Sequence, residues 1–233
     1  MRTSGVIYVY RPKHRHSLNQ KFGLALLALA LGGLTGPMLP AIRLEANYAY
    51  NQIFSKPKEQ SLPKSVPVLF DPLKIENGSI ISPINTEFSL IVPKIGINAP
   101  VIPAVNPANP GEYLEALQKG VAHSSTSFFP DQNGTVYLFS HSTNYDWFVK
   151  DLNAVFYLIK NLEEGDLIVL FYKGNRYTYR LREKQVVSAK SVSYIAPQQG
   201  GKRLILQTCW PPGTTTERLL IFADLVEEYG TTI

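Results

Sequence analysis

From residue 88 onward the chain is a succession of short β-type runs separated by turn signals, and this pattern limits the folds that it can adopt. The runs are rich in the branched and aromatic residues that favour strands. Regular alternation of strands with helices is missing, which disfavours a doubly wound parallel sheet. We therefore predict one mainly β domain, an antiparallel or mixed barrel of seven to eight strands. Strands are expected at residues 88–92, 97–102, 135–140, 166–172, 176–187, 203–208 and 218–226.

Two or three short helices are expected beside these strands. Helical pattern occurs at residues 111–120 and in parts of residues 146–165, and each segment ends in a glycine, which tolerates the left-handed conformation common after a helix. The run Lys173-Gly174-Asn175 between two strongly β-prone segments predicts a hairpin turn.

The N-terminal part of the chain predicts a membrane anchor. Residues 1–21 contain five Lys or Arg and no Asp or Glu, and residues 22–42 contain no charged residue at all. About 20 apolar residues cross the hydrocarbon core, and basic flanks stay in the cytoplasm. We expect a cytoplasmic tail, a single transmembrane helix at residues 22–42 in contact with membrane lipid, and an extracellular remainder. A cleaved signal peptide with its apolar region at residues 22–34 and a buried soluble helix are the alternatives.

Residues 43–86 predict a tether, because five prolines stand there among polar residues without sustained periodicity. One short helix is expected at its start, near residues 43–54. The folded domain is then expected at residues 87–233.

The charge distribution argues against nucleic acid as a partner. The net charge is +5, but five of the 23 Lys and Arg residues lie in the N-terminal tail, which leaves 18 basic against 18 acidic residues in the rest of the chain. A domain without a basic excess offers no net attraction for a phosphate backbone.

Cys209 is the only cysteine of the chain, so it has no internal disulfide partner. A lone cysteine is most often a small buried apolar residue. Here it follows an expected strand and precedes a loop with two prolines and a glycine, where reactive groups are commonly displayed. Arg218 opens the next strand and is expected at the same end of the sheet. A nearby cation favours the reactive thiolate, although a solvated charge is the simpler interpretation of such an arginine.

Two histidines lie in the expected domain, and histidine is the usual proton donor and acceptor in thiol enzymes. His141 follows the expected strand at residues 135–140, whereas His123 lies in a segment expected to connect elements. A single histidine is more often structural than catalytic. The combination of His141, Cys209 and Arg218 at strand ends favours the catalytic interpretation.

These residues resemble the sortase family of cysteine transpeptidases. The resemblance rests on "YLFSHS", where a strand ends in the histidine, on "ILQTC", and on an arginine that opens the following strand. It extends over residues 88–226. The segment "CWPPGTTTERL" is most similar to sortases of classes D and E. The resemblance implies a single closed β-barrel preceded by the N-terminal anchor.

The resemblance also implies the roles of the site residues. Cys209 is the expected nucleophile, His141 the general acid and base, and Arg218 the group that holds the substrate carbonyl or the oxyanion. Thr208 and His123 are expected to contribute to substrate binding. The expected substrate is an exported protein with a C-terminal signal similar to Leu-Pro-x-Thr-Gly or Leu-Ala-x-Thr-Gly, cleaved between Thr and Gly. The acyl group would pass to an amine of a cell-wall precursor or another surface protein.

No metal or cofactor is expected, because the scattered histidine, cysteine and carboxylate side chains form no zinc pattern. Some sortases bind calcium on loop carboxylates, but the sequence does not identify such a site. Two other functions stay open. The first is an inactive sortase-like scaffold, favoured by Ser140 at the position where the family commonly has glycine. The second is a hydrolytic cysteine peptidase on the same barrel.

Overall fold

The computed structural model describes residues 18–35, 39–54, 73–74, 80–142 and 155–229. Most of the expected basic tail, the central part of the expected tether and the first part of the helical pattern at residues 146–165 lie outside these ranges. The chain divides into two units, residues 1–40 and 41–233.

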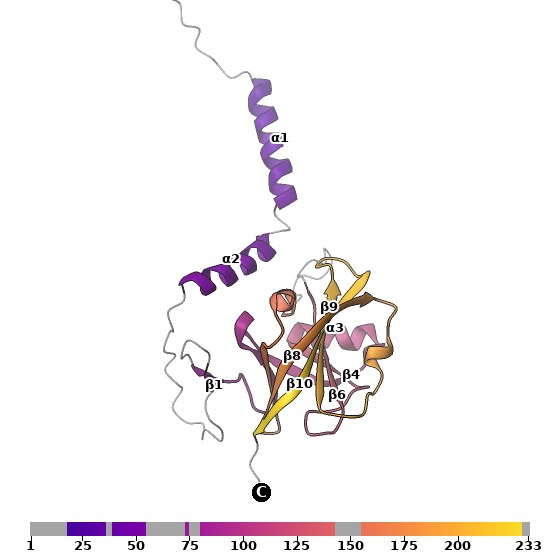
Figure 1. Cartoon of the computed structure of the whole chain (residues 1–233). Coiled ribbons are helices and arrows are strands. Elements are labelled where there is room, and N and C mark those ends of the chain that lie inside the picture. The colour runs from indigo at the N-terminus through magenta and orange to yellow at the C-terminus, as the bar shows by residue number, and fades with distance from the viewer. Residues whose placement is uncertain (1–17, 36–38, 55–72, 75–79, 143–154, 230–233) are drawn as a thin grey trace, which may run out of the picture. The chain divides into compact units, whose positions relative to one another are not determined.

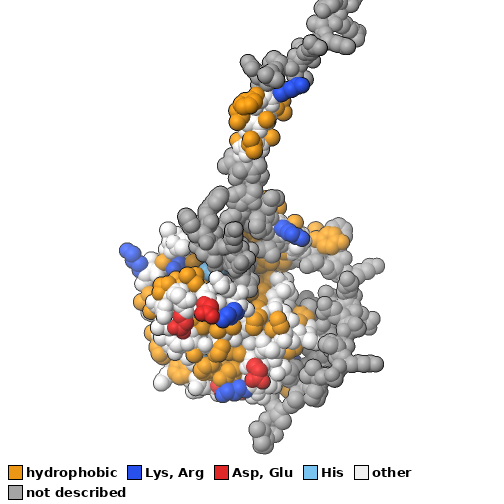
Figure 2. All heavy atoms as spheres, turned by 180° about the vertical axis from the view of Figure 1, so that it is seen from behind, with side chains coloured by type: hydrophobic (Ala, Val, Ile, Leu, Met, Phe, Trp, Pro, Cys, Tyr) orange, Lys and Arg blue, Asp and Glu red, His pale blue; other side chains and the backbone are white. Residues whose placement is uncertain are grey.

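The first unit contains helix α1, Leu18–Thr35. Figure 2 shows its hydrophobic side chains, and residues 21–30 are exposed. Among the described residues, no helix combines the length and the apolar character that crossing a membrane requires. The transmembrane assignment of residues 22–42 stays a prediction.

The second unit is built around a closed barrel of eight strands in the order β10-β8-β7-β3-β4-β5-β6-β9 (Figure 1). The pairs β4–β5 and β6–β9 are parallel, and the other pairs are antiparallel. The barrel closes because β10 pairs with β8 along one edge and with β9 along the other. The prediction of a mainly β, closed barrel is confirmed. The strands are β3 Phe88–Val92, β4 Ile97–Val105, β5 Val121–Ser124, β6 Thr135–Phe139, β7 Leu167–Tyr172, β8 Asn175–Ser188, β9 Arg203–Trp210 and β10 Glu217–Tyr229.

Two strands differ from the expectation in ways that affect the site. The four-residue strand β5 was not predicted, and it places His123 inside the sheet and not in a connecting segment. Its sequence Val-Ala-His-Ser has weak strand preference apart from the valine. Strand β9 continues to Trp210, two residues beyond the predicted end, because β10 pairs with it as far as Glu217.

The hairpin between β7 and β8 turns at Lys173 and Gly174, since Tyr172 pairs with Asn175. Both turn residues have positive φ angles of 49° and 78°, as a two-residue turn of type I′ requires. The predicted hairpin turn is confirmed.

Helix α3, Pro110–Lys119, crosses the outside of the barrel. The Asn109 side chain accepts a hydrogen bond from the Glu112 backbone N–H, and Pro110 occupies the first turn, where its missing N–H costs nothing. The helix ends at Gly120, where a Cβ atom would lie 2.3 Å from the Pro100 carbonyl oxygen. Glycine is therefore required for the close approach of the helix end to β4.

The remaining helical pieces lie in the connections and at the start of the second unit. Helix α2, Leu39–Phe54, overlaps the short helix expected at residues 43–54, and its Tyr48 packs against the barrel core. The Glu45 carboxylate of α2 lies 2.6 Å from Lys160 Nζ. The short helices are η2 Pro93–Ile95, η3 Tyr157–Asn161 and η4 Ser193–Ile195, and a small two-stranded sheet pairs β1 Leu73–Lys74 with β2 Ile80–Ile81.

Two hydrophobic clusters use the opposite faces of the barrel wall. The larger one fills the interior and includes Leu138, Leu206 and Ile221. The second lies on the outer face beneath α3 and contains Tyr137, Ile205 and other residues. Because successive strand residues point to opposite faces, Gln207 and Cys209 continue the outer row of Ile205. The outer face beside α3 is therefore where the predicted nucleophile lies.

Candidate active site

A pocket of about 530 Å³ lies on the outer face of the barrel, where β6, β9 and β10 run side by side (Figure 1). It brings together His141, Thr208, Cys209 and Arg218, four of the five residues that the sequence singles out. A volume of this size suits a small ligand or a short peptide segment. Side chains of α3, the segment 189–195 and the loop 213–215 form its walls: Tyr113, Leu114, Leu117, Ala189, Ser191, Val192, Ile195, Gly213, Thr214 and Thr215.

The register of β9 and β10 places Cys209 directly opposite Arg218. In antiparallel pairs such residues project from the same face of the sheet, with Cβ atoms about 5 Å apart. The Cys209 side chain is half-buried, so the sulfur is accessible from the pocket. The thiol and the guanidinium thus share one wall, although nine positions separate them in the sequence.

The Arg218 guanidinium is held by the loop that precedes it. Its Nη1 donates hydrogen bonds to the Thr215 carbonyl at 3.0 Å and to the Glu217 carbonyl at 2.9 Å. A guanidinium has five N–H groups, so Nη2 and Nε keep three. Within the described ranges these three have no protein acceptor. Among the described pocket residues Arg218 is also the only one with a permanent charge, so the pocket attracts a carbonyl or an oxyanion.

The backbone that leads into His141 is fixed by β9. The Ser140 N–H donates to the Gln207 carbonyl at 3.1 Å, and the buried Thr208 hydroxyl donates to the Ser140 carbonyl at 2.9 Å. The parallel pairing of β6 and β9 aligns Phe139 with Gln207, so His141 comes level with Cys209. The His141 carbonyl accepts from the Phe156 N–H at 3.2 Å on its other side. Thr208 is therefore placed to fix the peptide before His141, a contact inside the wall and not with a ligand.

A tyrosine–glutamine pair, which sequence reasoning missed, also lines the pocket. The Tyr137 hydroxyl donates a 2.5 Å hydrogen bond to Gln207 Oε1. Tyr137 is almost fully buried, and this burial raises the pKa of its hydroxyl, while the positive charge of Arg218 partly opposes that shift. Its hydroxyl stays protonated at neutral pH and remains a donor. Strand alternation could have placed Gln207 on the face of Cys209, two residues later, but it could not have identified Tyr137 as its partner.

The structure does not bring His123 to the pocket. The side chain is fully buried, and its ring stacks on Phe129 with centroids 4.5 Å apart. Nδ1 accepts from the Ala104 N–H at 3.2 Å, and Nε2 lies 3.0 Å from the Phe128 carbonyl. Burial lowers the pKa of His123, with the Phe128 hydrogen bond opposing that shift. His123 therefore lies outside the pocket lining and contacts backbone groups and Phe129.

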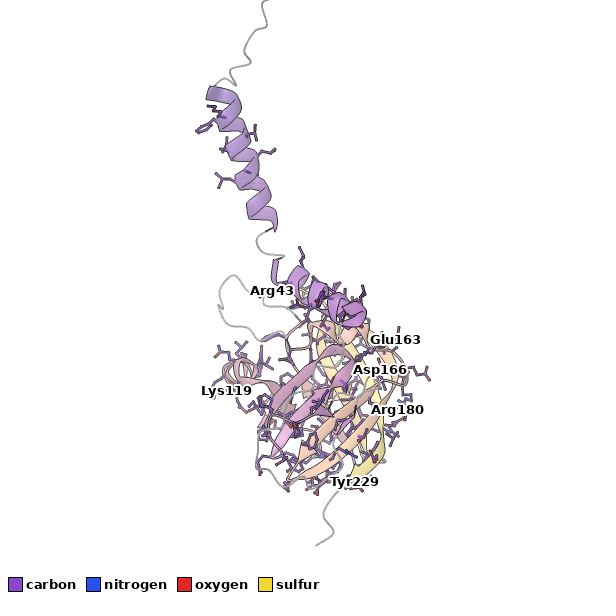
Figure 3. All side chains as sticks on the ribbon, turned by 90° about the vertical axis from the view of Figure 1, so that its left-hand side faces the viewer. Arg43, Lys119, Glu163, Asp166, Arg180 and Tyr229 are labelled. Atoms are coloured by element: carbon purple, nitrogen blue, oxygen red, sulfur yellow. The ribbon has the colours of Figure 1, made fainter. Side chains whose placement is uncertain are left out.

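The described residues contain no group of three or more His, Cys, Asp or Glu side chains that could hold a metal ion. The labelled pair Glu163 and Asp166 lies on one side of the domain (Figure 3), but both carboxylates bind Lys94 Nζ, at 2.7 and 3.0 Å. The Lys94 ammonium already offsets part of their charge.

The family model of the sortase domain matches residues 90–226, which is more than half of the chain. The chain belongs to the sortase family. The family identified from the sequence motifs is thereby confirmed. Sortase D of Bacillus subtilis (strain 168) is 29% identical over 140 residues, a stretch that covers 59% of this chain and 62% of that protein. The chain thus spans less than two thirds of the length of this relative. The class D relative agrees with the resemblance to classes D and E.

Solved sortase structures share the fold. Sortase C-1 from Actinomyces oris superposes with a TM-score of 0.50 and 21% identity, covering 62% of this chain and 76% of that one. The Sortase D5 transpeptidase of Clostridium perfringens gives 0.50 and 20%, covering 63% and 82%. Sortase E1 from Streptomyces coelicolor, solved with a tripeptide in its active site, gives 0.50 and 21%, covering 62% and 90%. At these identities the similarity establishes the fold.

Proposed function

We propose that this sortase is a cysteine transpeptidase with Cys209 as nucleophile, His141 as general acid and base, and Arg218 as carbonyl-binding group. The observation that carries the proposal is the convergence of these three side chains on one pocket. The pairing of Cys209 with Arg218 and the alignment of β6 with β9 support it.

The reaction follows from the chemistry of these groups. Cys209 gives its thiol proton to His141, and Sγ attacks the carbonyl carbon of the threonine in a Leu-Pro-x-Thr-Gly-like or Leu-Ala-x-Thr-Gly-like signal, while the N–H groups of Arg218 bind the developing oxyanion. The carbon–nitrogen bond breaks as His141 gives a proton to the leaving glycine amine, which leaves a thioester on Cys209. A second amine attacks the thioester, His141 takes the proton of that amine, and a new amide forms as the sulfur leaves.

The substrates follow from the family. We propose that the acyl donor is an exported protein with a C-terminal sorting signal and that the acceptor is an amine of a cell-wall precursor or of another surface protein. The described pocket residues support binding of an uncharged peptide segment. None of them is acidic, and helix α3 and the segment 189–195 contribute apolar side chains. A single cysteine suits this chemistry outside the cell, since no internal disulfide can trap the thiol.

Intact-mass spectrometry of the full-length chain in detergent tests the activity. The chain is incubated with each of the two signal peptides, with and without a glycine or lysine amine. Because the chain has one cysteine, an acyl adduct that disappears in Cys209→Ala assigns the nucleophile. Transfer to the added amine is the expected result. Release of free acid that amines cannot divert would identify a hydrolytic peptidase, and peptide binding without an adduct would identify a scaffold.

We also propose that residues 22–42 anchor the protein in the cell membrane, with the N-terminus cytoplasmic and the barrel extracellular. The support is the uncharged stretch after a basic segment. Protease treatment of intact cells that carry terminal tags tests this topology. The expected result is loss of the C-terminal tag with the N-terminal tag retained in the membrane fraction. Recovery of the whole chain in the soluble fraction would contradict the anchor.

A further inference from the structure

The pocket contains a second set of polar groups beside the three proposed catalytic side chains. Gln207 lies on β9 two residues before Cys209, so both side chains project from the same face of the strand. The distance along a strand between such positions is about 7 Å. Gln207 therefore lies one step along the pocket floor from the atom that we propose to attack the substrate.

The Gln207 carboxamide has its two ends in different situations. Its carbonyl oxygen accepts the hydrogen bond of the buried Tyr137 hydroxyl. Within the described part of the chain this is the one hydrogen bond of the Gln207 side chain, so the NH2 group has no protein acceptor. Gln207 is half-buried and lines the pocket, and its NH2 group is absent from the buried polar atoms that lack a partner, so the group is not fully enclosed by the protein.

The tyrosine makes this arrangement directional. A carboxamide can turn about its terminal bond and offer either end to the pocket. The buried Tyr137 hydroxyl donates its single proton to Oε1, and this hydrogen bond engages the carbonyl end of Gln207. The NH2 end is then directed away from Tyr137. The pair holds a fixed hydrogen-bond donor at the floor of a half-enclosed pocket.

We propose that the NH2 group of Gln207, oriented by Tyr137, binds a backbone carbonyl of the acyl-donor peptide, one or two residues before the carbonyl that Cys209 attacks. This inference rests on the proposed transpeptidase function and assigns a binding contact within it. An extended peptide rises about 3.3 Å per residue, so its carbonyl two residues away, at about 6.6 Å, matches the spacing from Cys209 to Gln207, and the carbonyl one residue away lies between the two. A pocket donor left without an acceptor selects for ligands that supply one.

The contact would act on the acyl half of the substrate, which stays bound while the amine half leaves. Gln207 is therefore a substrate-binding residue, and Tyr137 is a positioning residue that acts through it. Loss of the NH2 group weakens peptide binding and raises KM, and it changes kcat less. Loss of the Tyr137 hydroxyl has a smaller effect, because the NH2 group remains but is no longer held in one orientation.

Peptide binding to the full-length Cys209→Ala protein tests the contact without requiring the reaction. Gln207→Met in this background removes the donor and keeps the length of the side chain. We expect the dissociation constant, measured by calorimetry, to be about three- to tenfold larger. Tyr137→Phe should lower the peptide affinity less. The double variant with Gln207→Met should bind the peptide as tightly as Gln207→Met alone, since Tyr137 acts through Gln207.

Matched controls come from elsewhere on the barrel. Gln185 also accepts from a tyrosine hydroxyl, that of Tyr194 at 3.4 Å, but it does not line the pocket, so Gln185→Met should bind peptide as the parent does. Tyr179 is buried with a hydroxyl that has no hydrogen-bond partner among the described residues, and Tyr179→Phe controls for the loss of a buried hydroxyl.

Peptides that lack one carbonyl at a time locate the contact. A trans-alkene replaces the peptide bond one, two or three residues before the scissile carbonyl. The alkene one residue or two residues before the scissile carbonyl should weaken peptide binding to the parent protein. The same alkene should not weaken binding to Gln207→Met any further. If Gln207 has only a structural role, the alkene should lower the peptide affinity of the parent and of Gln207→Met by the same factor.

The outcomes separate this inference from the proposed function. Normal peptide binding by Gln207→Met overturns the contact, and an acyl adduct on Cys209 in the otherwise native chain then leaves the transpeptidase standing. If peptide binding depends on Gln207 but no acyl adduct forms on Cys209, the contact is supported and the proposed transpeptidase function is contradicted. Absence of both binding and adduct overturns both.

Discussion

One histidine of the barrel lies within β5 and the other just after the neighbouring strand β6, and their environments contrast. His123 belongs to β5, is fully buried, and has both ring nitrogens within hydrogen-bond distance of backbone groups. His141 comes two residues after the end of β6, is half-buried, and lines the pocket with Cys209. The same residue type therefore contacts backbone groups inside the sheet in one place and lines the pocket in the other. What differs is the position relative to the strand end and not the chemistry of the side chain.

The largest expected effect compares the two histidines directly. His141→Gln should lower the rate of Cys209 acylation about 10²- to 10⁴-fold, since a positioned proton donor contributes this much. His123→Gln should lower the unfolding temperature, because the buried imidazole loses its hydrogen bond with the Ala104 N–H and its stacking on Phe129, and should leave the acylation rate of the folded protein near that of the parent. Peptide acylation rates and thermal melts of both variants check this. Equal loss of activity in the two would remove the distinction.

Arg218→Gln should lower kcat/KM for the signal peptide about 10²- to 10³-fold, the typical contribution of one oxyanion-binding group. Glutamine keeps a neutral donor and removes the charge and the fork of N–H groups that face the pocket. Steady-state kinetics measure the loss, with Arg180→Gln as the control. Arg180 lies on β8 outside the pocket lining. A loss of similar size in the control would mean that general charge, and not the position of Arg218, matters.

Thr208→Val should destabilise the domain by about 1–3 kcal/mol, because the buried Ser140 carbonyl loses its hydroxyl donor. Acylation should also slow, since Ser140 directly precedes His141. Denaturant unfolding and acylation rates of the variant measure both effects. Thr216→Val, at an exposed position of the loop, should change stability by less than about 0.5 kcal/mol. Normal activity in Thr208→Val would show that this hydrogen bond does not position His141.

The smallest expected effect is a pH dependence from His123. Burial lowers the pKa of His123 below its unfolded value of about 6.5, so the unfolded chain binds the proton first as the pH falls. The contribution to stability is complete above about pH 6.5 and declines below it, by at most about 1.4 kcal/mol per pH unit. Unfolding free energies between pH 5 and 8 should show this slope in the parent and lose it in His123→Gln. An unchanged slope in the variant would place the titration elsewhere.

The barrel was predictable because most of its strands are rich in branched and aromatic residues and are separated by clear turns. Strand β5 was not, since Val121–Ser124 is too short for a pattern and forms only because β4 and β6 pair with it. That omission also explains the expectation for His123. A histidine in a connecting segment is available to a ligand, whereas one inside a covered sheet is not.

The residues of the site likewise include some that the sequence predicted and some that it did not. The grouping of His141, Cys209 and Arg218 followed from strand ends and the family motif, both local features of the sequence. The Tyr137–Gln207 pair joins two strands that are 70 positions apart, so it depends on the parallel register of β6 and β9, which the sequence does not state. The role of Thr208 within the wall depends on the same register. Sequence patterns predict which residues face one side of a strand, and the pairing decides what they contact.

A crystal structure of the full-length chain with the acyl group trapped on Cys209 tests the central claim most directly. The account predicts that the acyl chain lies in the pocket between α3 and residues 189–195, with its carbonyl oxygen bound by Arg218 and the His141 imidazole facing the sulfur. An acyl carbonyl that points away from Arg218, while His141 lies too far from the sulfur to exchange a proton, would contradict it.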